Sequence, residues 1–222
     1  MLELGTWAPG ARFATERELE EEFGVSRAVI RPALDLLVGD GTIFRVKGSG
    51  AFVAAPRPEI TASGLVKLLT EGRSDHSVSV VSARRRKSDR TVAQFLELGK
   101  SRAEIAHVTA VIDPGKPSAF VIDSYSSIAR LPWLLPTAEA LANGSAPPKP
   151  GKLKLTRSTV LIEHTFFSEW AASQLKSTAG NSALMGRYVQ FGRTNGAKRE
   201  RPLEFARLIY RADAVQLAFE LD

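Results

Sequence analysis

The clearest structural signal lies in residues 15–37, which read TERELEEEFGVSRAVIRPALDLL. Thr15 and Glu18 form a capping box, in which each side chain accepts a hydrogen bond from the other residue's backbone amide. Gly24 supplies the left-handed conformation that favours the end of a helix, and Ser26 is a good cap for the start of another. The stretch therefore predicts two helices joined by a turn of about three residues, which is a helix-turn-helix.

The second predicted helix has an apolar face and a basic face. Its apolar positions recur at helical spacing and are expected to be buried: Ile30, Ala33, Leu34 and Leu37. Leu19 and Phe23, four residues apart on the first helix, are expected to be buried as well. The other face begins with Arg27 and Arg31 beside the positive end of the helix, an arrangement that suits a phosphate or a guanine edge. Pro32 lies inside this helix, where proline costs about 3 kcal/mol, and predicts a kink.

A β-hairpin is predicted after Gly41, which ends the second helix. Residues 42–46, TIFRV, and 51–53, AFV, flank a turn at 47–50 that reads KGSG. Glycines in the turn allow the backbone to approach a sugar-phosphate chain closely, and Lys47 adds a positive charge. A helix-turn-helix followed by such a hairpin predicts a winged helix.

These motifs, in this order and spacing, resemble the DNA-binding domain of GntR-family regulators. The resemblance rests on PGARFATEREL at 9–19, FGVSR at 23–27, AL at 33–34, Gly41 and GSGAFV at 48–53. It implies that Arg17, Arg27 and Arg31 contact phosphates and base edges. It also implies that Ala28 and Val29 are variable recognition positions and that the wing tip, at Gly48, enters the minor groove. The predicted DNA contacts are Arg17, Arg27, Ala28, Val29, Arg31, Arg45, Lys47 and Gly48. The family has a full helix before the Pro-Gly turn, whereas only Met1 to Gly5 precede it here, so we expect that first helix to be largely missing.

The composition is that of an ordinary globular protein, with 222 residues of which 44% are hydrophobic and 24% charged. No apolar run approaches the roughly 18 residues of a membrane helix, and the start lacks a signal-peptide pattern, so we expect a cytoplasmic protein with no membrane partner. The absence of cysteine excludes disulfides, thiolate catalysis and cysteine-ligated zinc. The net charge of +6 does not come from the first 57 residues, so DNA binding has to be argued from the positions of the charges.

We predict two domains. Residues 1–55 form the winged helix-turn-helix, residues 56–62 are a linker because they hold two prolines, and residues 63–222 form an effector-binding and dimerisation domain. In this second domain, alternating β-rich segments with few helices predict an α+β fold around an antiparallel sheet. The expected strands cover 78–84, 105–112, 118–125, 158–166, 184–191, 203–210 and 215–220, and the expected helices 63–71, 90–96, 136–143 and 168–177.

Two strand-turn-strand units in the second domain share one form, with a polar turn that ends in proline. Together with PLEFA at 202–206 and YRAD at 210–213, they resemble the ligand-sensing UTRA domain of HutC-like GntR regulators. The resemblance implies a sheet of chorismate-lyase-like type, a homodimer, and a pocket for a small-molecule effector in each copy. Related sugar-phosphate sensors carry two arginines where this chain has Thr109 and Val111, so no phosphate clamp is expected there.

Candidate effector contacts follow from strand alternation. Asp123 and Tyr125 share one face of a strand, and a buried Asp123 requires a cation or hydrogen-bond donors, although a paired structural carboxylate is an equal alternative. The basic run at 84–87 is most simply a solvated surface. Strand alternation can also place the side chains of Arg84 and Arg86 in a pocket that binds an anion. The candidate effector residues are Arg84, Arg86, Asp123, Tyr125, Arg207 and Tyr210. Trp170 is interpreted as a core residue.

The sequence therefore predicts a DNA-binding transcription regulator, a repressor that a small-molecule effector releases from a double-stranded DNA operator. No cofactor is expected, and no enzymatic activity, because nucleophile-elbow and phosphate-loop motifs are lacking. The three histidines are not at metal-ligand spacing, which disfavours the all-helical, metal-binding sensor type. The alternative is an α+β ligand-binding or enzymatic domain that carries a vestigial winged-helix segment.

Overall fold

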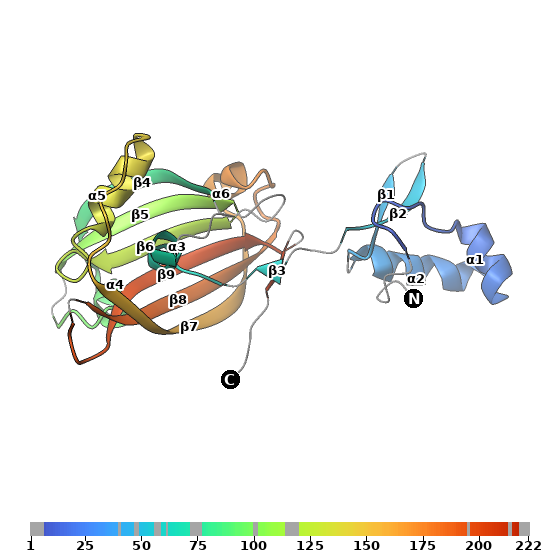
Figure 1. The fold of residues 1–222 in the computed structure, drawn as a ribbon. Helices are drawn as coiled ribbons and strands as arrows, with labels where there is room; N and C mark the ends of the chain where they lie inside the picture. Colours follow the sequence, from blue (N-terminus) through green and yellow to red (C-terminus); the bar gives the residue numbers. More distant parts are fainter. Residues whose placement is uncertain are drawn as a thin grey trace. The chain divides into compact units, whose positions relative to one another are not determined.

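The computed structural model describes residues 7–39, 41–46, 49–55, 59–60, 62–71, 77–99, 102–113, 120–194, 196–212 and 215–217. The chain divides into two compact units, 1–57 and 58–222, which Figure 1 shows as a small and a large body. Within the predicted linker, residues Glu59–Ile60 form the short strand β3, and Ala62 is already buried in the core of the second unit. None of the helices in the described residues is long and apolar enough to cross a membrane.

The first unit has the helix-turn-helix and hairpin that the sequence predicts. Its elements are α1 (Glu16–Phe23), α2 (Arg27–Gly39), β1 (Ile43–Val46) and β2 (Gly50–Val53). The capping box is present: the Glu18 amide donates to Thr15 Oγ1 at 3.2 Å, and the Thr15 amide donates to Glu18 Oε2 at 2.6 Å. Gly24 ends α1 at a φ of 64°, which a residue without a Cβ adopts freely. These local signals therefore act as expected, and α2 continues through Pro32.

The core of the first unit is smaller than predicted. It consists of Leu19, Ile30, Leu34 and Ile43, with a few half-buried neighbours. Phe23 was expected in it but its residue surface is 58% exposed, because no other described residue packs over the last turn of α1. Ala33 is also exposed, since the buried stripe of α2 follows the four-residue step from Ile30 to Leu34. The expected loss of the family's first helix concerns residues 1–6, which lie outside the described residues.

The second unit is built on a six-stranded antiparallel sheet with the strand order β4-β5-β6-β9-β8-β7. This confirms the predicted α+β fold. The strands are β4 (Ser77–Lys87), β5 (Glu104–Asp113), β6 (Phe120–Ser127), β7 (Leu153–Phe166), β8 (Ser182–Thr194) and β9 (Arg201–Arg211). A separate parallel pair joins β3 to β10 (Gln216–Leu217).

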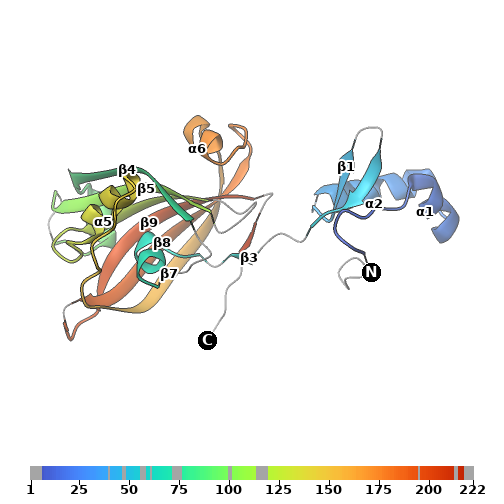
Figure 2. The same ribbon diagram turned by 45° about the horizontal axis from the view of Figure 1, so that its top comes forward.

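Helices pack on both faces of the sheet and make three apolar clusters. The largest cluster lies under α3 (Leu65–Glu71) and α5 (Leu134–Ala142), which stand in front of the sheet in Figure 1. On the opposite face, α4 (Arg90–Phe95) covers one end and α6 (Glu169–Gln174) covers the other, each with its own cluster. Figure 2 shows α6 standing on this second face. The part of the second face that lies between the α4 and α6 clusters, called here the cleft face, carries polar side chains.

A buried carboxylate fixes α3 to the sheet. Glu204 of β9 is fully buried and accepts hydrogen bonds from the amides of Leu65 at 2.8 Å and Val66 at 3.1 Å, as well as from the Ser124 hydroxyl. Burial raises the pKa of Glu204 to about 7, against the opposing effect of these donors. A Cβ at Gly64 would collide with this carboxylate, so the chain can pass here only as glycine.

Candidate nucleic-acid interface and effector cleft

The start of α2 presents two arginines that share one carboxylate. Arg27 Nε lies 2.6 Å from Glu16 Oε2, and Arg31 Nε lies 3.3 Å from Glu16 Oε1. Both arginine side chains are 64% exposed, whereas Glu16 is only 25% exposed. Partial desolvation acts to raise the pKa of Glu16, but the two guanidinium groups hold it below its usual value. The capping box of α1 thus begins a helix whose first residue holds both guanidinium groups side by side.

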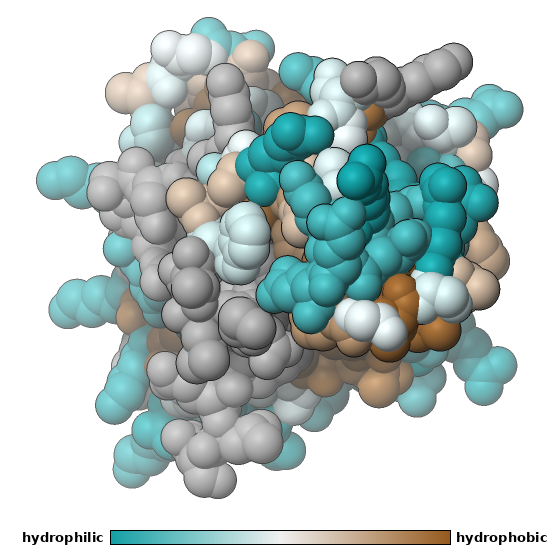
Figure 3. Space-filling model, turned by 90° about the vertical axis from the view of Figure 1, so that its right-hand side faces the viewer, coloured by the Kyte–Doolittle hydropathy of each residue, from teal (hydrophilic) through white to brown (hydrophobic). Residues whose placement is uncertain are grey.

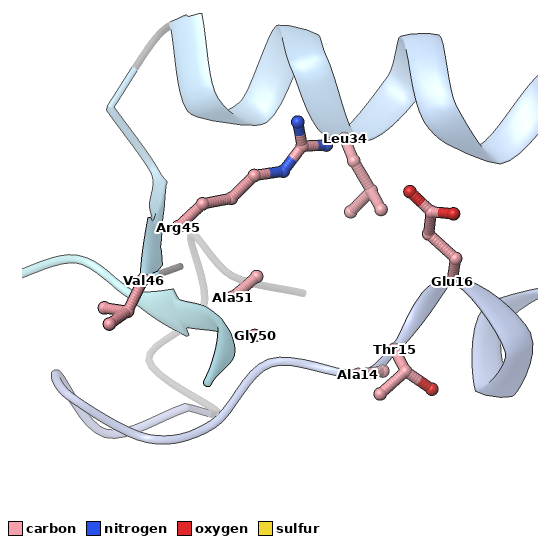
Figure 4. Close-up of a pocket in the computed structure, with 8 residues that line it drawn as sticks. All are labelled: Ala14, Thr15, Glu16, Leu34, Arg45, Val46, Gly50 and Ala51. Carbon is pink, nitrogen blue, oxygen red and sulfur yellow. The ribbon is translucent and has the colours of Figure 1, made fainter. Parts of the chain in front are cut away.

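The other cations of the first unit are placed differently. Arg17 is well exposed and its Nε lies 2.9 Å from Glu21 Oε1, one turn further along α1. Arg45 reaches from β1 towards α2, where its Nη1 lies 2.7 Å from Asp35 Oδ1 (Figure 4). Arg17 and Arg45 thus each pair with a separate acid, whereas Arg27 and Arg31 share one.

A hollow of about 350 Å³ lies between the start of α1, the middle of α2 and the hairpin. Figure 4 shows Leu34 pointing into it from α2 and Glu16 pointing up towards α2. The residues that line it are Ala14, Thr15, Glu16, Leu34, Arg45, Val46, Gly50 and Ala51. Figure 3 shows polar side chains gathered over much of the coloured surface, with hydrophobic residues among them.

The remaining predicted DNA contacts are two exposed residues and two that cannot be placed. Ala28 and Val29 are exposed beside Arg27, on the first turn of α2. Lys47 and Gly48, at the predicted wing tip, lie outside the described residues.

The second candidate site is a cleft of about 370 Å³ on the cleft face of the sheet. Strands β4, β5 and β6 provide its floor and α6 provides a wall. Its lining residues, which define the effector cleft, are Val81, Ser82, Arg84, His107, Thr109, Asp123 and Trp170. Two of the six predicted effector residues, Arg84 and Asp123, therefore lie in one cavity.

Asp123 is the centre of a hydrogen-bonded chain across the floor. Its Oδ1 accepts from the Thr109 hydroxyl at 2.6 Å and lies 3.3 Å from His107 Nε2. Arg84 Nε donates to His107 Nδ1 at 3.5 Å, so Nδ1 is the acceptor and Nε2 carries the hydrogen that points to Asp123. Desolvation acts to raise the pKa of Asp123, but His107 and Thr109 hold it below its usual value. Oδ1 of this carboxylate is thus satisfied by the protein.

Three more predicted residues lie beside the cleft but not among its lining residues. Tyr125 is buried and stacks on His107, with 4.5 Å between the ring centroids. Arg86 lies over the Tyr125 ring at 6.0 Å and 3.7 Å from the Asp89 carboxylate. Arg207 is exposed on β9 and is the cross-strand partner of Asp123.

The placement of Tyr210 with these residues was wrong. Tyr210 is fully buried in the large cluster under α3 and α5 and packs on Phe120, with ring centroids 4.8 Å apart. Successive strand residues point to opposite faces, so Tyr210 and Arg207, three positions apart, lie on different faces. The sequence alone contains this information.

The interpretation of Trp170 as core was also wrong, because its residue surface is 42% exposed and it lines the cleft. His107 and Thr109 were not among the predicted contacts. The signal that could have found them is their alternation on β5, two residues apart on the face that Asp123 shares through strand pairing.

Comparison with known proteins identifies the first unit. Residues 1–53 match the family described as bacterial regulatory proteins, gntR family. The first unit is a GntR-family domain. The predicted likeness to this family is therefore confirmed for residues 1–53.

Three curated relatives of this chain are named as repressors. The HTH-type transcriptional repressor NagR of Bacillus subtilis is 39% identical over 70 residues, which are 32% of this chain and 29% of NagR. The probable fructoselysine utilization operon transcriptional repressor of Shigella flexneri is 30% identical over 132 residues, 58% of this chain and 53% of that protein. The histidine utilization repressor of Pseudomonas putida is 43% identical over 56 residues, 25% of this chain and 23% of that repressor, which fits the HutC-like assignment. The chain thus spans about half, or less, of the length of these relatives.

Two solved structures are similar to this chain in fold. PhnF from Mycobacterium smegmatis aligns with a TM-score of 0.57 at 20% identity, over 99% of this chain and 96% of PhnF. The ligand-binding domain of a putative GntR-family regulator from Bordetella bronchiseptica aligns with a TM-score of 0.53 at 17% identity, over 67% of this chain and 94% of that domain. At these identities the likeness concerns the fold alone, and it includes the six-stranded sheet of the second unit.

Proposed function

We propose that this chain is a sequence-specific DNA-binding transcription regulator, a repressor that leaves its operator when a small molecule binds its second unit. The observation that carries the proposal is the pair of exposed arginines, Arg27 and Arg31, held by one carboxylate at the start of α2 in a GntR-family domain. The names of the curated relatives, all repressors, support the same direction of control.

The geometry of the pair suits groove recognition. Each guanidinium group uses its Nε on Glu16, and within the described residues no protein partner occupies its terminal nitrogens. Two such nitrogens form a planar fork that matches the O6 and N7 acceptors of guanine or two phosphate oxygens. Glu16 is thus a positioning residue. Because it restricts the orientations of each arginine before DNA binds, it reduces the conformational entropy that the arginines lose on binding.

We further propose that the regulator works as a homodimer in the cytoplasm and has no enzymatic activity. A dimer presents two copies of α2 to two half-sites about one helical turn apart. A ligand that binds one arrangement of the two copies more tightly than another changes their fit to these half-sites, and this difference in affinity is the regulatory coupling.

The effector cleft is the proposed ligand site. Its volume lies in the range of small-molecule pockets, and it combines charged groups with an exposed indole. Arg84 and Asp123 are the proposed direct contacts, with Arg207, Arg86 and Tyr125 around them.

The experiment is a fluorescence-anisotropy titration of the chain with DNA from upstream of its own gene. Arg27→Ala and Arg31→Ala should each weaken binding by about 1–3 kcal/mol if the lost contact is bidentate. Arg85→Ala removes the same charge from the second unit and should bind like the unchanged protein. Glu16→Gln should lower the ratio of operator affinity to random-DNA affinity, because it frees the guanidinium groups while removing a negative charge near the duplex.

Unchanged affinity in both arginine variants would overturn the assigned interface. If no upstream fragment binds at all, the α+β ligand-binding protein with a vestigial winged-helix segment becomes the better description.

A further inference from the structure

One cation in the effector cleft lacks an acidic partner. Residues 84–87 form the run RRRK on β4, and three of these four side chains are paired within the described residues. Arg85 and Lys87 both contact Glu104, and Arg86 faces Asp89. Arg84, the one member that lines the cleft, has a single polar contact among the described residues, to an imidazole nitrogen of His107. Its terminal nitrogens are therefore available to an anion, and one guanidinium group matches one carboxylate.

An acceptor without a donor lies across the floor from this cation. Asp123 Oδ1 takes both protein contacts, from Thr109 and His107, while Oδ2 has no partner in the described part of the chain. The Asp123 side chain is 28% exposed, so a ligand can reach it. Arg207, its cross-strand neighbour, adds positive charge but makes no hydrogen bond to it among the described residues. An ionised oxygen that is partly withdrawn from water favours a cationic donor.

The two groups lie on either side of the His107 imidazole ring, 3.5 Å from Nδ1 for Arg84 Nε and 3.3 Å from Nε2 for Asp123 Oδ1. His107 accepts from Arg84 through Nδ1 and faces Asp123 through Nε2, so the guanidinium and carboxylate groups lie at opposite edges of the same ring. An ammonium and a carboxylate on one carbon are spaced to span such a distance. Among the described lining residues Arg84 is the one arginine, and β5 provides Thr109 there, so the lining matches a singly charged group better than a doubly charged phosphate.

The wall of the cleft is apolar. Trp170 presents its exposed indole to the cavity, and Val81 also lines it. Indole faces favour flat or apolar groups, which gain contact area there without losing hydrogen bonds.

We propose that the effector cleft binds a zwitterionic ligand of the amino-acid class, with its carboxylate on Arg84, its ammonium on Asp123 and an apolar or aromatic side chain against Trp170. This inference rests on the proposed function, because it names the ligand class of the same site.

The test is a titration of the full chain with each of the twenty standard amino acids, in which binding is monitored by the change in the protein's tryptophan fluorescence. For every amino acid that binds, the matched acid without the amine and the matched amine without the carboxylate are titrated as well. At least one apolar or aromatic amino acid should bind, and loss of either charged group should weaken binding at least tenfold. Trp170→Phe should remove the fluorescence change while calorimetry still detects binding.

Two variants assign the charges. Asp123→Asn, which keeps the shape and the contact to Thr109, should abolish the preference for the amine-bearing ligand. Arg84→Gln should abolish the preference for the carboxylate-bearing ligand. Arg85→Gln, the next residue on the opposite face of β4, is the matched control and should leave both preferences unchanged.

The outcomes separate this inference from the proposed function when upstream DNA is titrated in parallel. If the chain binds its DNA but none of the amino acids, or binds the deaminated acids as tightly, the ligand class is refuted and the function stands. If it binds an amino acid as described but no upstream DNA, the function is refuted and the ligand class stands.

Discussion

The two units of this protein reach their folds through interactions of different range. In the first unit, a capping box, a left-handed glycine and a four-residue apolar step act between residues that are close in the chain. In the second unit, the centre of the sheet is the pairing of β6 with β9, and Ser124 meets Glu204 across 80 positions of sequence. Local rules thus specify a small unit with a minimal core, while the large core depends on strand order.

The largest expected effect tests whether the two units are energetically separate. Leu208→Ala empties part of the large core and should lower the free energy of unfolding of the second unit by about 2–5 kcal/mol. Leu34→Ala should act on the first unit alone. Urea unfolding followed through Trp7 for the first unit, and through Trp133 and Trp170 for the second, checks this. If either variant shifts both transitions equally, the units unfold as one.

A second effect should belong to the second unit only. The folded pKa of Glu204 is about 7, against an ordinary value of 4.5, so between these pH values the folded chain keeps a proton that the unfolded chain has lost. The stability from this group is complete below about pH 4.5 and is lost as the pH rises towards about 7, with a size of roughly 3 kcal/mol. Unfolding free energies measured from pH 4 to 8 should show a smaller decline in Glu204→Gln. An equal decline in both proteins would contradict the assignment.

The smallest effects should appear in the first unit, where the apolar core does not extend to the last turn of α1. Leu19→Ala should cost about 2 kcal/mol because Leu19 is buried. Phe23→Ser, one turn away on the same helix, should change stability by less than about 0.5 kcal/mol because its ring is exposed. Thermal unfolding of the first unit, followed by Trp7 fluorescence, separates the two. A large loss in Phe23→Ser would show that this ring is covered in solution.

The sequence was sufficient to predict secondary structure where the signal involves residues that are close together in the chain. Thr15, Glu18 and Gly24 predicted the two ends of α1, and alternation located the strands of the second unit to within a few residues. It was insufficient for burial, which depends on what packs against a residue. Phe23 and Trp170 have apolar side chains at helical positions, yet both remain exposed because no described element covers them fully.

The candidate cleft shows the same limit. Arg84 and Asp123 were predicted, but the residue that connects them, His107, enters through the pairing of β5 with both β4 and β6. That strand order is a property of the folded sheet and has no local signature. The wrong placement of Tyr210 is of another kind, since its spacing of three from Arg207 already assigned it to the other face.

The contact between Glu204 and the first turn of α3 has a practical meaning for engineering. Because Leu65 and Val66 are tied to β9 and Gly64 has no room for a side chain, the packed part of the second unit begins at about Ala62. Hybrid proteins that exchange the second unit should therefore be spliced upstream of that residue. A junction placed between Ala62 and Val66 would cut through the anchor itself.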